Sequence, residues 1–118
     1  MRSKRAIGTD YEQKAVQYLE NLGYQILEKN FRCKMGEIDL VARDGEYLVF
    51  VEVKYRADGK MGQPQEAVDF RKQHRICKAA SYYCMLHRIS GMQPCRFDVA
   101  ACMGGTWTII RDAFPYIY

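Results

Sequence analysis

Three acidic side chains and a lysine gather on one predicted β-hairpin. Glu37 and Asp39 alternate along its first strand, and Glu52 and Lys54 alternate along its second. Side chains two apart on a strand point to the same face, and directly opposed residues share a face. Carboxylates brought together in this way repel one another, whereas a hard divalent cation takes oxygen ligands. The pattern therefore predicts a metal site with an amine beside it.

The turn between the two strands predicts how they pair. Residues 43–46 read Arg-Asp-Gly-Glu, and Asp-Gly suits a two-residue type I′ loop. This loop places Glu37 opposite Glu52. It also places Asp39 opposite Phe50, so the charged residues lie on one face, at the end away from the turn.

The chemistry that fits this set is metal-assisted attack of water on a phosphodiester. A bound metal acts as a Lewis acid, and Lys54 can stabilise charge or orient the nucleophile. The alternative is a solvated strand end with ordinary salt bridges, because Glu-x-Lys alone is common. The apolar neighbours of Glu52 and the presence of Asp39 on the paired strand favour the site.

The elements around the hairpin predict a single α/β domain over residues 1–118. The chain is 48% hydrophobic and 27% charged, which is ordinary globular composition. Residues 1–8 form a basic tail. The predicted order is α-β-β-β-α-β-β, an α-β sandwich around a mixed five-stranded sheet. The helices are predicted from Thr9 to Leu22 and over 66–89, and the strands over 24–31, 37–42, 47–55, 96–103 and 106–111.

The first helix offers a further carboxylate. Thr9 and Glu12 have the spacing of a capping box, and Gly23 suits the position after the helix. Glu12 nevertheless has Ala15 and Val16 three and four residues on, which turns it towards the apolar side. Capping and a place in the metal site are equally open for Glu12.

The long helix brings a second lysine towards the hairpin. Lys72 and Asp69 lie four and seven residues before the apolar Ile76, so both are predicted on the sheet-facing side. Lys72 then contacts phosphate or the acidic cluster, and the alternative is that it snorkels along the edge of the core.

Polar and basic residues from the end of the hairpin into this helix predict contacts to a nucleic-acid backbone. The net charge of +4 permits a polyanionic partner without requiring one. A solvated helix face is the alternative. The candidate contacts are Arg56, Lys60, Gln65, Arg71, Lys72 and Arg75.

Cysteine use and hydropathy predict a cytoplasmic chain with no membrane partner. The five cysteines are odd in number and include no Cys-x-x-Cys, so reduced thiols serving as small core residues are expected. No apolar run reaches the length of a membrane span, and the basic amino terminus lacks the apolar stretch of a secretory signal.

Two segments carry a resemblance to a known family. Residues 36–42, GEIDLVA, and 48–56, LVFVEVKYR, resemble the YraN-like family, whose members are predicted endonucleases. That family resembles the Holliday-junction resolvases of the PD-(D/E)xK nuclease superfamily. The resemblance extends over nearly the whole chain, with Ile38 standing where the superfamily name has proline.

The resemblance implies a restriction-endonuclease-like fold and a set of roles. Asp39, Glu52 and the main-chain carbonyl of Val53 would hold Mg²⁺ or Mn²⁺, and Lys54 would position or help to deprotonate the attacking water. Glu12 resembles the amino-terminal helix glutamate of such nucleases. With Glu37, it is a further candidate for the metal.

The sequence thus predicts a metal-dependent endonuclease acting on DNA, with branched DNA as one candidate substrate. One alternative is a nucleic-acid-binding module that keeps the fold without cleaving. Another is a protein-interaction subunit whose aromatic tail, residues 114–118, docks on a partner or on a second copy. Resolvases act as dimers because a junction presents two symmetric strands, so a homodimer is also open.

Overall fold

The computed structural model describes residues 4–56 and 68–117, with side chains described from residue 10 onward. It confirms the predicted α/β class and the order α-β-β-β-α-β-β. The elements are α1 (Lys4–Asn21), β1 (Gln25–Cys33), β2 (Gly36–Asp44), β3 (Tyr47–Arg56), α2 (Phe70–Leu86), β4 (Cys95–Met103) and β5 (Thr106–Ile110).

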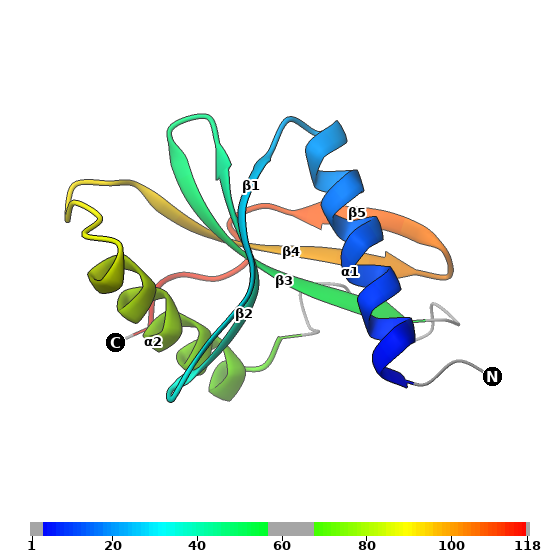
Figure 1. Ribbon diagram of the computed structural model, residues 1–118, viewed down its shortest axis with the longest axis horizontal. Coiled ribbons are helices and arrows are strands. Elements are labelled where there is room, and N and C mark those ends of the chain that lie inside the picture. The colour runs from blue at the N-terminus through cyan, green and yellow to red at the C-terminus, as the bar shows by residue number, and fades with distance from the viewer. Residues whose placement is uncertain (1–3, 57–67, 118) are drawn as a thin grey trace.

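The five strands form one sheet in the order β1-β2-β3-β4-β5 (Figure 1). β3 and β4 run parallel, whereas the other neighbouring pairs are antiparallel. A parallel pair needs a crossover connection, and α2 lies within the segment that joins β3 to β4. The mixed sheet follows from this single crossover.

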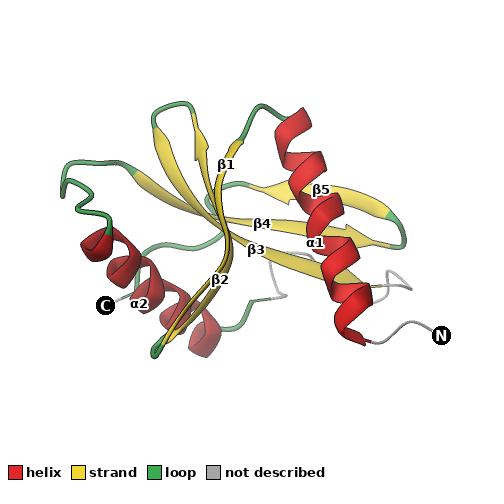
Figure 2. Cartoon of the chain, viewed as in Figure 1, coloured by secondary structure: helices red, strands yellow, loops and turns green. Residues whose placement is uncertain are grey.

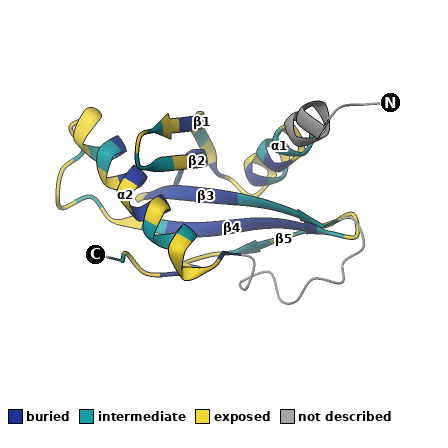
Figure 3. Cartoon of the chain, turned by 90° about the horizontal axis from the view of Figure 1, so that it is seen from below, coloured by how far each residue is buried: buried dark blue, intermediate teal, exposed yellow. Residues whose placement is uncertain are grey.

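The two helices cover opposite faces of the sheet, as Figures 2 and 3 show. On one face, Ala15 and Leu19 of α1 pack in a buried cluster with Val49 and Val51 of β3. On the other face, α2 packs in a second cluster that includes Phe50. Successive residues of β3 therefore serve different cores, which is the alternation expected of a strand covered on both faces.

The hairpin pairs differently from the sequence-based prediction. Val41 pairs with Phe50, and Asp44 pairs with Tyr47, so the loop consists of residues 45 and 46. Gly45 has a φ of 61°, and glycine at the first loop position suits a type II′ turn rather than the predicted type I′ turn. The predicted pairs of Glu37 with Glu52 and of Asp39 with Phe50 are therefore wrong. Because the partner shifts by two residues, the residues of the paired segments 40–44 and 47–51 keep their predicted faces.

The start of the first helix also differs from the prediction. α1 begins at Lys4 and includes residues 4–8 of the predicted tail, so Thr9 lies inside the helix and the capping box is wrong. The predicted end is confirmed. Gly23 has a φ of 99°, and its N–H donates to the carbonyl of Glu20 at 3.0 Å. Helices commonly end on such a glycine.

The second helix is shorter than predicted. Asp69 is its N-cap and accepts a hydrogen bond from the Lys72 N–H at 2.8 Å, so α2 begins at Phe70. Asp69 is exposed, and its predicted position on the sheet-facing side is wrong because an N-cap lies outside the helical face. Across residues 4–56 and 68–117, no helix has the length and apolar character needed to cross a membrane.

The aromatic tail folds back on the chain. Phe114 is buried and stacks on Phe97 with ring centroids 5.0 Å apart. The hydroxyl groups of Tyr116 and Ser81 share a hydrogen bond of 2.7 Å, which fastens the tail to α2. These contacts disfavour the alternative in which the tail is held out for a partner.

Candidate active site

A cleft of about 410 Å³ collects the charged residues predicted from the hairpin and from α2. Side chains from α1, β2, β3 and α2 meet there, although Tyr11 and Lys72 lie 61 positions apart in the chain. The cleft is lined by Tyr11, Glu12, Glu37, Asp39, Glu52, Val53, Lys54, Tyr55, Arg56 and Lys72.

Asp39 is fixed by a break in the strand pattern of β2. The regular pairing of β2 with β3 runs only as far as Leu40, which faces Val51. Ile38 packs in the cluster under α2, whereas Leu40 packs in the cluster under α1, so the usual alternation fails between them. The Asp39 carboxylate accepts a hydrogen bond from the Val53 N–H at 2.8 Å. Asp39 is thereby aimed at β3.

The electrostatic environment of Asp39 disfavours its charge. Burial, together with the nearby Glu52 carboxylate, raises the pKa of Asp39 to about 7, against the opposing effects of the Val53 N–H and Lys72. The charge of Glu12 also raises the pKa of Asp39, by a smaller amount. Neighbouring carboxylates repel one another when both are ionised, so a cation that binds between them is stabilised by relieving this repulsion.

Glu52 is the most buried carboxylate of the cleft, with 6% of its side chain exposed. Its Oε1 atom lies 2.7 Å from Lys72 Nζ and 3.9 Å from Lys54 Nζ. The predicted contact of Lys72 with the acidic cluster is therefore present. Because an unpaired buried charge is costly, the two amines compensate Glu52 in the metal-free protein.

The two lysines are not equivalent. Burial lowers the pKa of Lys54, and the neighbouring Lys72 amine lowers it further. Burial acts in the same direction on Lys72, but the ion pair with Glu52 outweighs it and raises the pKa of Lys72. Lys72 is thus the fixed positive charge of the cleft, and Lys54 is the amine that gives up a proton more readily.

Glu12 reaches the cleft from α1, as one of its two predicted roles requires. Tyr11 stacks on Tyr55 with ring centroids 3.6 Å apart, which docks this part of α1 on β3. The Glu12 carboxylate accepts a hydrogen bond from Asn30 Nδ2 at 3.2 Å. Sequence reasoning missed the two tyrosines, because Tyr11 fits the apolar stripe of a helix and Tyr55 points to the face opposite Lys54.

Glu37 and Arg56 lie at the rim of the cleft. The Glu37 side chain is 62% exposed and forms an ion pair of 3.4 Å with Arg32. Arg56 lines the cleft, and its guanidinium donates to the Tyr55 carbonyl at 3.1 Å. Neither position has the burial of Glu52, so these two residues are better suited to meeting a large ligand than to closing around a small ion.

The remaining predicted contacts to nucleic acid divide into two groups. Arg71 and Arg75 are exposed on α2 and are not among the residues that line the cleft. Their spacing of four residues places them on one side of the helix. Lys60 and Gln65 lie outside the described residues.

The donor set fits a partly hydrated divalent cation. Within residues 4–56 and 68–117, no three His, Cys, Asp or Glu side chains form a ready cage for a metal. Asp39 and Glu52 offer two carboxylates, and Val53, which also lines the cleft, offers a main-chain carbonyl. Mg²⁺ commonly binds through one or two carboxylates, with water and substrate phosphate completing its octahedron. The residues present therefore fit Mg²⁺ or Mn²⁺.

A second polar cluster lies outside the cleft and was not predicted. Asp98 is fully buried and forms an ion pair of 2.8 Å with Arg96. It also accepts hydrogen bonds from the Tyr24 hydroxyl at 2.6 Å and from the Asp112 N–H at 3.0 Å. This cluster ties the segment after α1 to β4. Arg96 and Asp98 lie two apart on β4, but no local spacing signals that Tyr24 and Asp112 meet them.

Comparisons with known proteins agree on one family. The profile described as "Uncharacterised protein family UPF0102" matches residues 11–102, which include every residue that lines the cleft. A UPF0102 protein of Lachnoclostridium phytofermentans is 46% identical over 112 residues, covering 95% of each chain. A UPF0102 protein of Syntrophus aciditrophicus is 48% identical, covering 91% of this chain and 87% of its own. One of Clostridium botulinum is 50% identical, covering 92% and 93%.

Proposed function

The chain belongs to the UPF0102 family, and from this premise we propose that it is a divalent-metal-dependent endonuclease that hydrolyses phosphodiester bonds of DNA. The observation that supports the proposal most is the convergence of Asp39 with Glu52 and Lys54 in one cleft. This set matches the acidic residue and the (D/E)xK pair of the PD-(D/E)xK nucleases, which the hairpin sequence resembles. The proposal therefore places the chain in that superfamily.

Asp39, Glu52 and the carbonyl of Val53 would hold Mg²⁺ or Mn²⁺, which supplies Lewis-acid activation of water and charge neutralisation at the phosphate. Glu12 is a further carboxylate of the cleft that could contribute through water, and it acts electrostatically on Asp39. Lys72 now bonds to the same oxygen of Glu52 that Lys54 approaches. If Glu52 bound a cation, Lys72 would lose its ion-pair partner and could bind a phosphate oxygen instead.

Lys54 has the role of handling the proton of the attacking water. Its amine lies in the cleft beside Glu52, and its lowered pKa makes the neutral form more accessible near neutral pH than for a free lysine. A neutral amine can accept a proton, and a charged one can stabilise the developing negative charge. Either way, the residue acts in the transition state rather than in holding the metal.

The substrate backbone would follow the positive charges around the cleft. Arg56 lies at the rim, and Arg71 and Arg75 stand exposed on α2. Lys60 and Gln65 remain candidates from the sequence. Phosphate contacts of this kind position a nucleic acid without reading its bases. Selection of branched DNA would therefore come from shape, and a homodimer would present two clefts to two strands.

The test is a comparison of branched, flapped, single-stranded and duplex DNA, each incubated with Mg²⁺, with Mn²⁺ and with EDTA. We expect cleavage with either metal and none with EDTA. Binding of DNA without cleavage under all conditions would favour the non-cleaving module. Absence of both binding and cleavage on every substrate would reject a role in nucleic-acid metabolism. Light scattering of the free and DNA-bound protein tests the dimer.

A further inference from the structure

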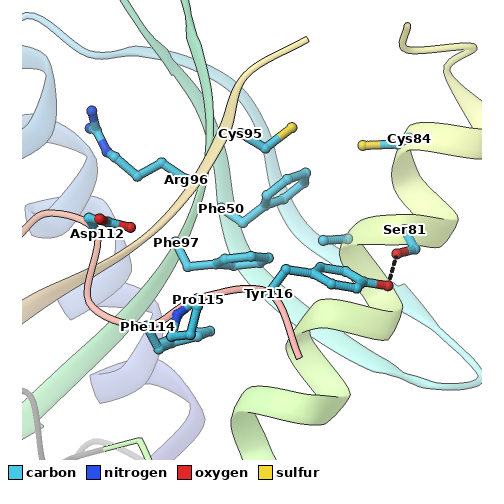
Figure 4. Close-up of a pocket in the computed structure, with 11 residues that line it drawn as sticks. Phe50, Ser81, Cys84, Cys95, Arg96, Phe97, Asp112, Phe114, Pro115 and Tyr116 are labelled. Carbon is cyan, nitrogen blue, oxygen red and sulfur yellow. Dashed lines mark hydrogen bonds between the residues drawn. The ribbon is translucent and has the colours of Figure 1, made fainter. Parts of the chain in front are cut away.

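A second pocket, of about 340 Å³, lies between α2, the sheet and the carboxyl-terminal tail (Figure 4). Aromatic rings of Phe50, Phe97 and Phe114 form much of its wall. Cys84 of α2 and Cys95 of β4 also line it, and Figure 4 shows their sulfur atoms pointing towards one another. The pocket shares no lining residue with the charged cleft.

The two thiols differ from the other three cysteines. Cys77 and Cys102 are buried, as expected of small core residues, and Cys33 is half-buried on β1, where its thiol donates to the Gly36 carbonyl at 3.4 Å. Cys95 is exposed, which contradicts the prediction of a core thiol. Cys84 is half-buried behind it. Cys95 is thus the thiol that solutes can reach, and Cys84 is the thiol that it faces.

The surroundings give Cys95 and Cys84 opposite acidities. Hydrogen bonding by the Cys84 thiol, helped by the charge of Arg43, lowers the pKa of Cys95 to about 7 although burial opposes this. The same pairing and burial raise the pKa of Cys84. A thiolate is the reactive form of cysteine, and accessible cysteines of low pKa beside a second cysteine are typical of oxidant-reactive sites.

We propose that Cys84 and Cys95 form a hydroperoxide-reactive dithiol that closes into an intramolecular disulfide between α2 and β4. This site is independent of the nuclease proposal, because it uses other residues and a different ligand. Its substrate class is a small hydroperoxide, and the mouth of the apolar pocket is where such a molecule meets Cys95.

The chemistry balances in two steps. The Cys95 thiolate attacks one peroxide oxygen, the O–O bond breaks, and the released alkoxide or hydroxide takes a proton, leaving Cys95 as a sulfenic acid. The Cys84 sulfur then attacks the Cys95 sulfur, the S–O bond breaks, and the thiol proton leaves with the hydroxyl group as water. Two thiols lose two electrons and two protons, and the hydroperoxide becomes water and an alcohol, or two waters from hydrogen peroxide.

The test uses the full chain treated with hydrogen peroxide and digested with trypsin without reduction. Trypsin cuts after Lys78, Arg88 and Arg96, so it places Cys84 in residues 79–88 and Cys95 in residues 89–96. These two peptides stay joined only if the disulfide has formed. We expect the joined species, about 2 Da lighter than the sum of the two peptides, and its loss on reduction.

Two variants and a control make the result specific. In Cys84→Ser, Cys95 should stop at the sulfenic acid, which dimedone traps. In Cys95→Ser, Cys84 should remain a free thiol. The control Cys33→Ser should form the disulfide as the parent does. The proposal is overturned if Cys33 is oxidised before Cys95, or if the only disulfide joins two chains. It is also overturned if the native protein forms the Cys84–Cys95 disulfide with no greater preference over other cysteine pairs than the protein unfolded in urea.

Discussion

The ε-amino group of Lys72 lies 2.7 Å from the Glu52 carboxylate, joining the first turn of α2 to the middle of β3. Glu52 is 6% exposed, and Lys72 is 34% exposed. Removing one partner of a buried ion pair costs about 3–5 kcal/mol, and the partial exposure of Lys72 reduces that cost. The same ion pair thus stabilises the metal-free protein and holds α2 and β3 together at the cleft.

Lys72→Ala should lower the free energy of unfolding of the metal-free protein by about 1–2 kcal/mol. Lys78→Ala is the matched control, because Lys78 is an exposed lysine on the same helix, and it should change stability by less than about 0.5 kcal/mol. Urea denaturation in EDTA measures both. Equal effects of the two variants would mean that the Lys72 pair contributes nothing beyond an ordinary surface lysine.

The raised pKa of Asp39 predicts a pH dependence of stability. Its folded value is about 7, whereas an unfolded aspartate titrates near about 4. Between these values only the folded state keeps the proton, so Asp39 makes the free energy of unfolding fall as pH rises through this window. The total effect is at most about 4 kcal/mol.

Asp39→Asn removes this titration, so the difference in stability between the variant and the parent should grow in favour of the variant from about pH 4 to about pH 7. Denaturation of both proteins in EDTA across this range measures the difference. A constant difference across the range would show that Asp39 titrates as an ordinary aspartate. Saturating Mg²⁺ should stabilise the parent at the upper end, because a bound cation favours the ionised carboxylate.

Much of the cleft could be predicted from the sequence, because the face on which a residue lies depends only on its spacing from neighbours in the same strand or helix. Asp39, Glu52 and Lys54 lie on their predicted elements, and Lys72 was found by counting back from Ile76. The hairpin register was wrong because Asp-Gly-Glu allows two loop positions, yet a shift of two residues preserves parity.

Other features depend on packing between distant segments. The helix start at Thr9 was wrong because a capping box describes a local preference, and α1 extends through it to Lys4. The facing of Cys84 and Cys95 results from the return of β4 to the sheet beside β3. No residue spacing within α2 or within β4 could predict that contact.

The buried Asp98 cluster should be important for stability and neutral for chemistry. Asp98→Asn keeps the size of the side chain but leaves Arg96 with one charge partner fewer, so the free energy of unfolding should fall by about 3 kcal/mol. Asp112→Asn is the control, since asparagine tolerates its positive φ of 54°. Calorimetric melting measures both. A stable Asp98→Asn protein would contradict the structural role.

The proposed contacts to a nucleic-acid backbone predict salt-dependent binding. Arg71→Ala and Arg75→Ala should each weaken DNA binding similarly on all sequences, and each should reduce the slope of log affinity against log salt by about 1. Arg88→Gln is the control, because Arg88 follows the opposite end of α2. Fluorescence anisotropy at several salt concentrations measures the slope. Binding that does not respond to salt would exclude these arginines from the interface.

The most direct test of the nuclease assignment is the single-turnover rate of phosphodiester cleavage with Mg²⁺, measured for the parent, Glu52→Gln, Lys54→Ala and the control Glu20→Gln. Glu20 is exposed on α1 and does not line the cleft. In the proposed mechanism, Glu52→Gln removes a charged metal ligand, and Lys54→Ala removes a group that acts only in the transition state. We predict that both variants cleave slower by on the order of 10³-fold, while Glu20→Gln stays close to the parent. A Glu52→Gln protein that cuts DNA at the parental rate would contradict the assignment.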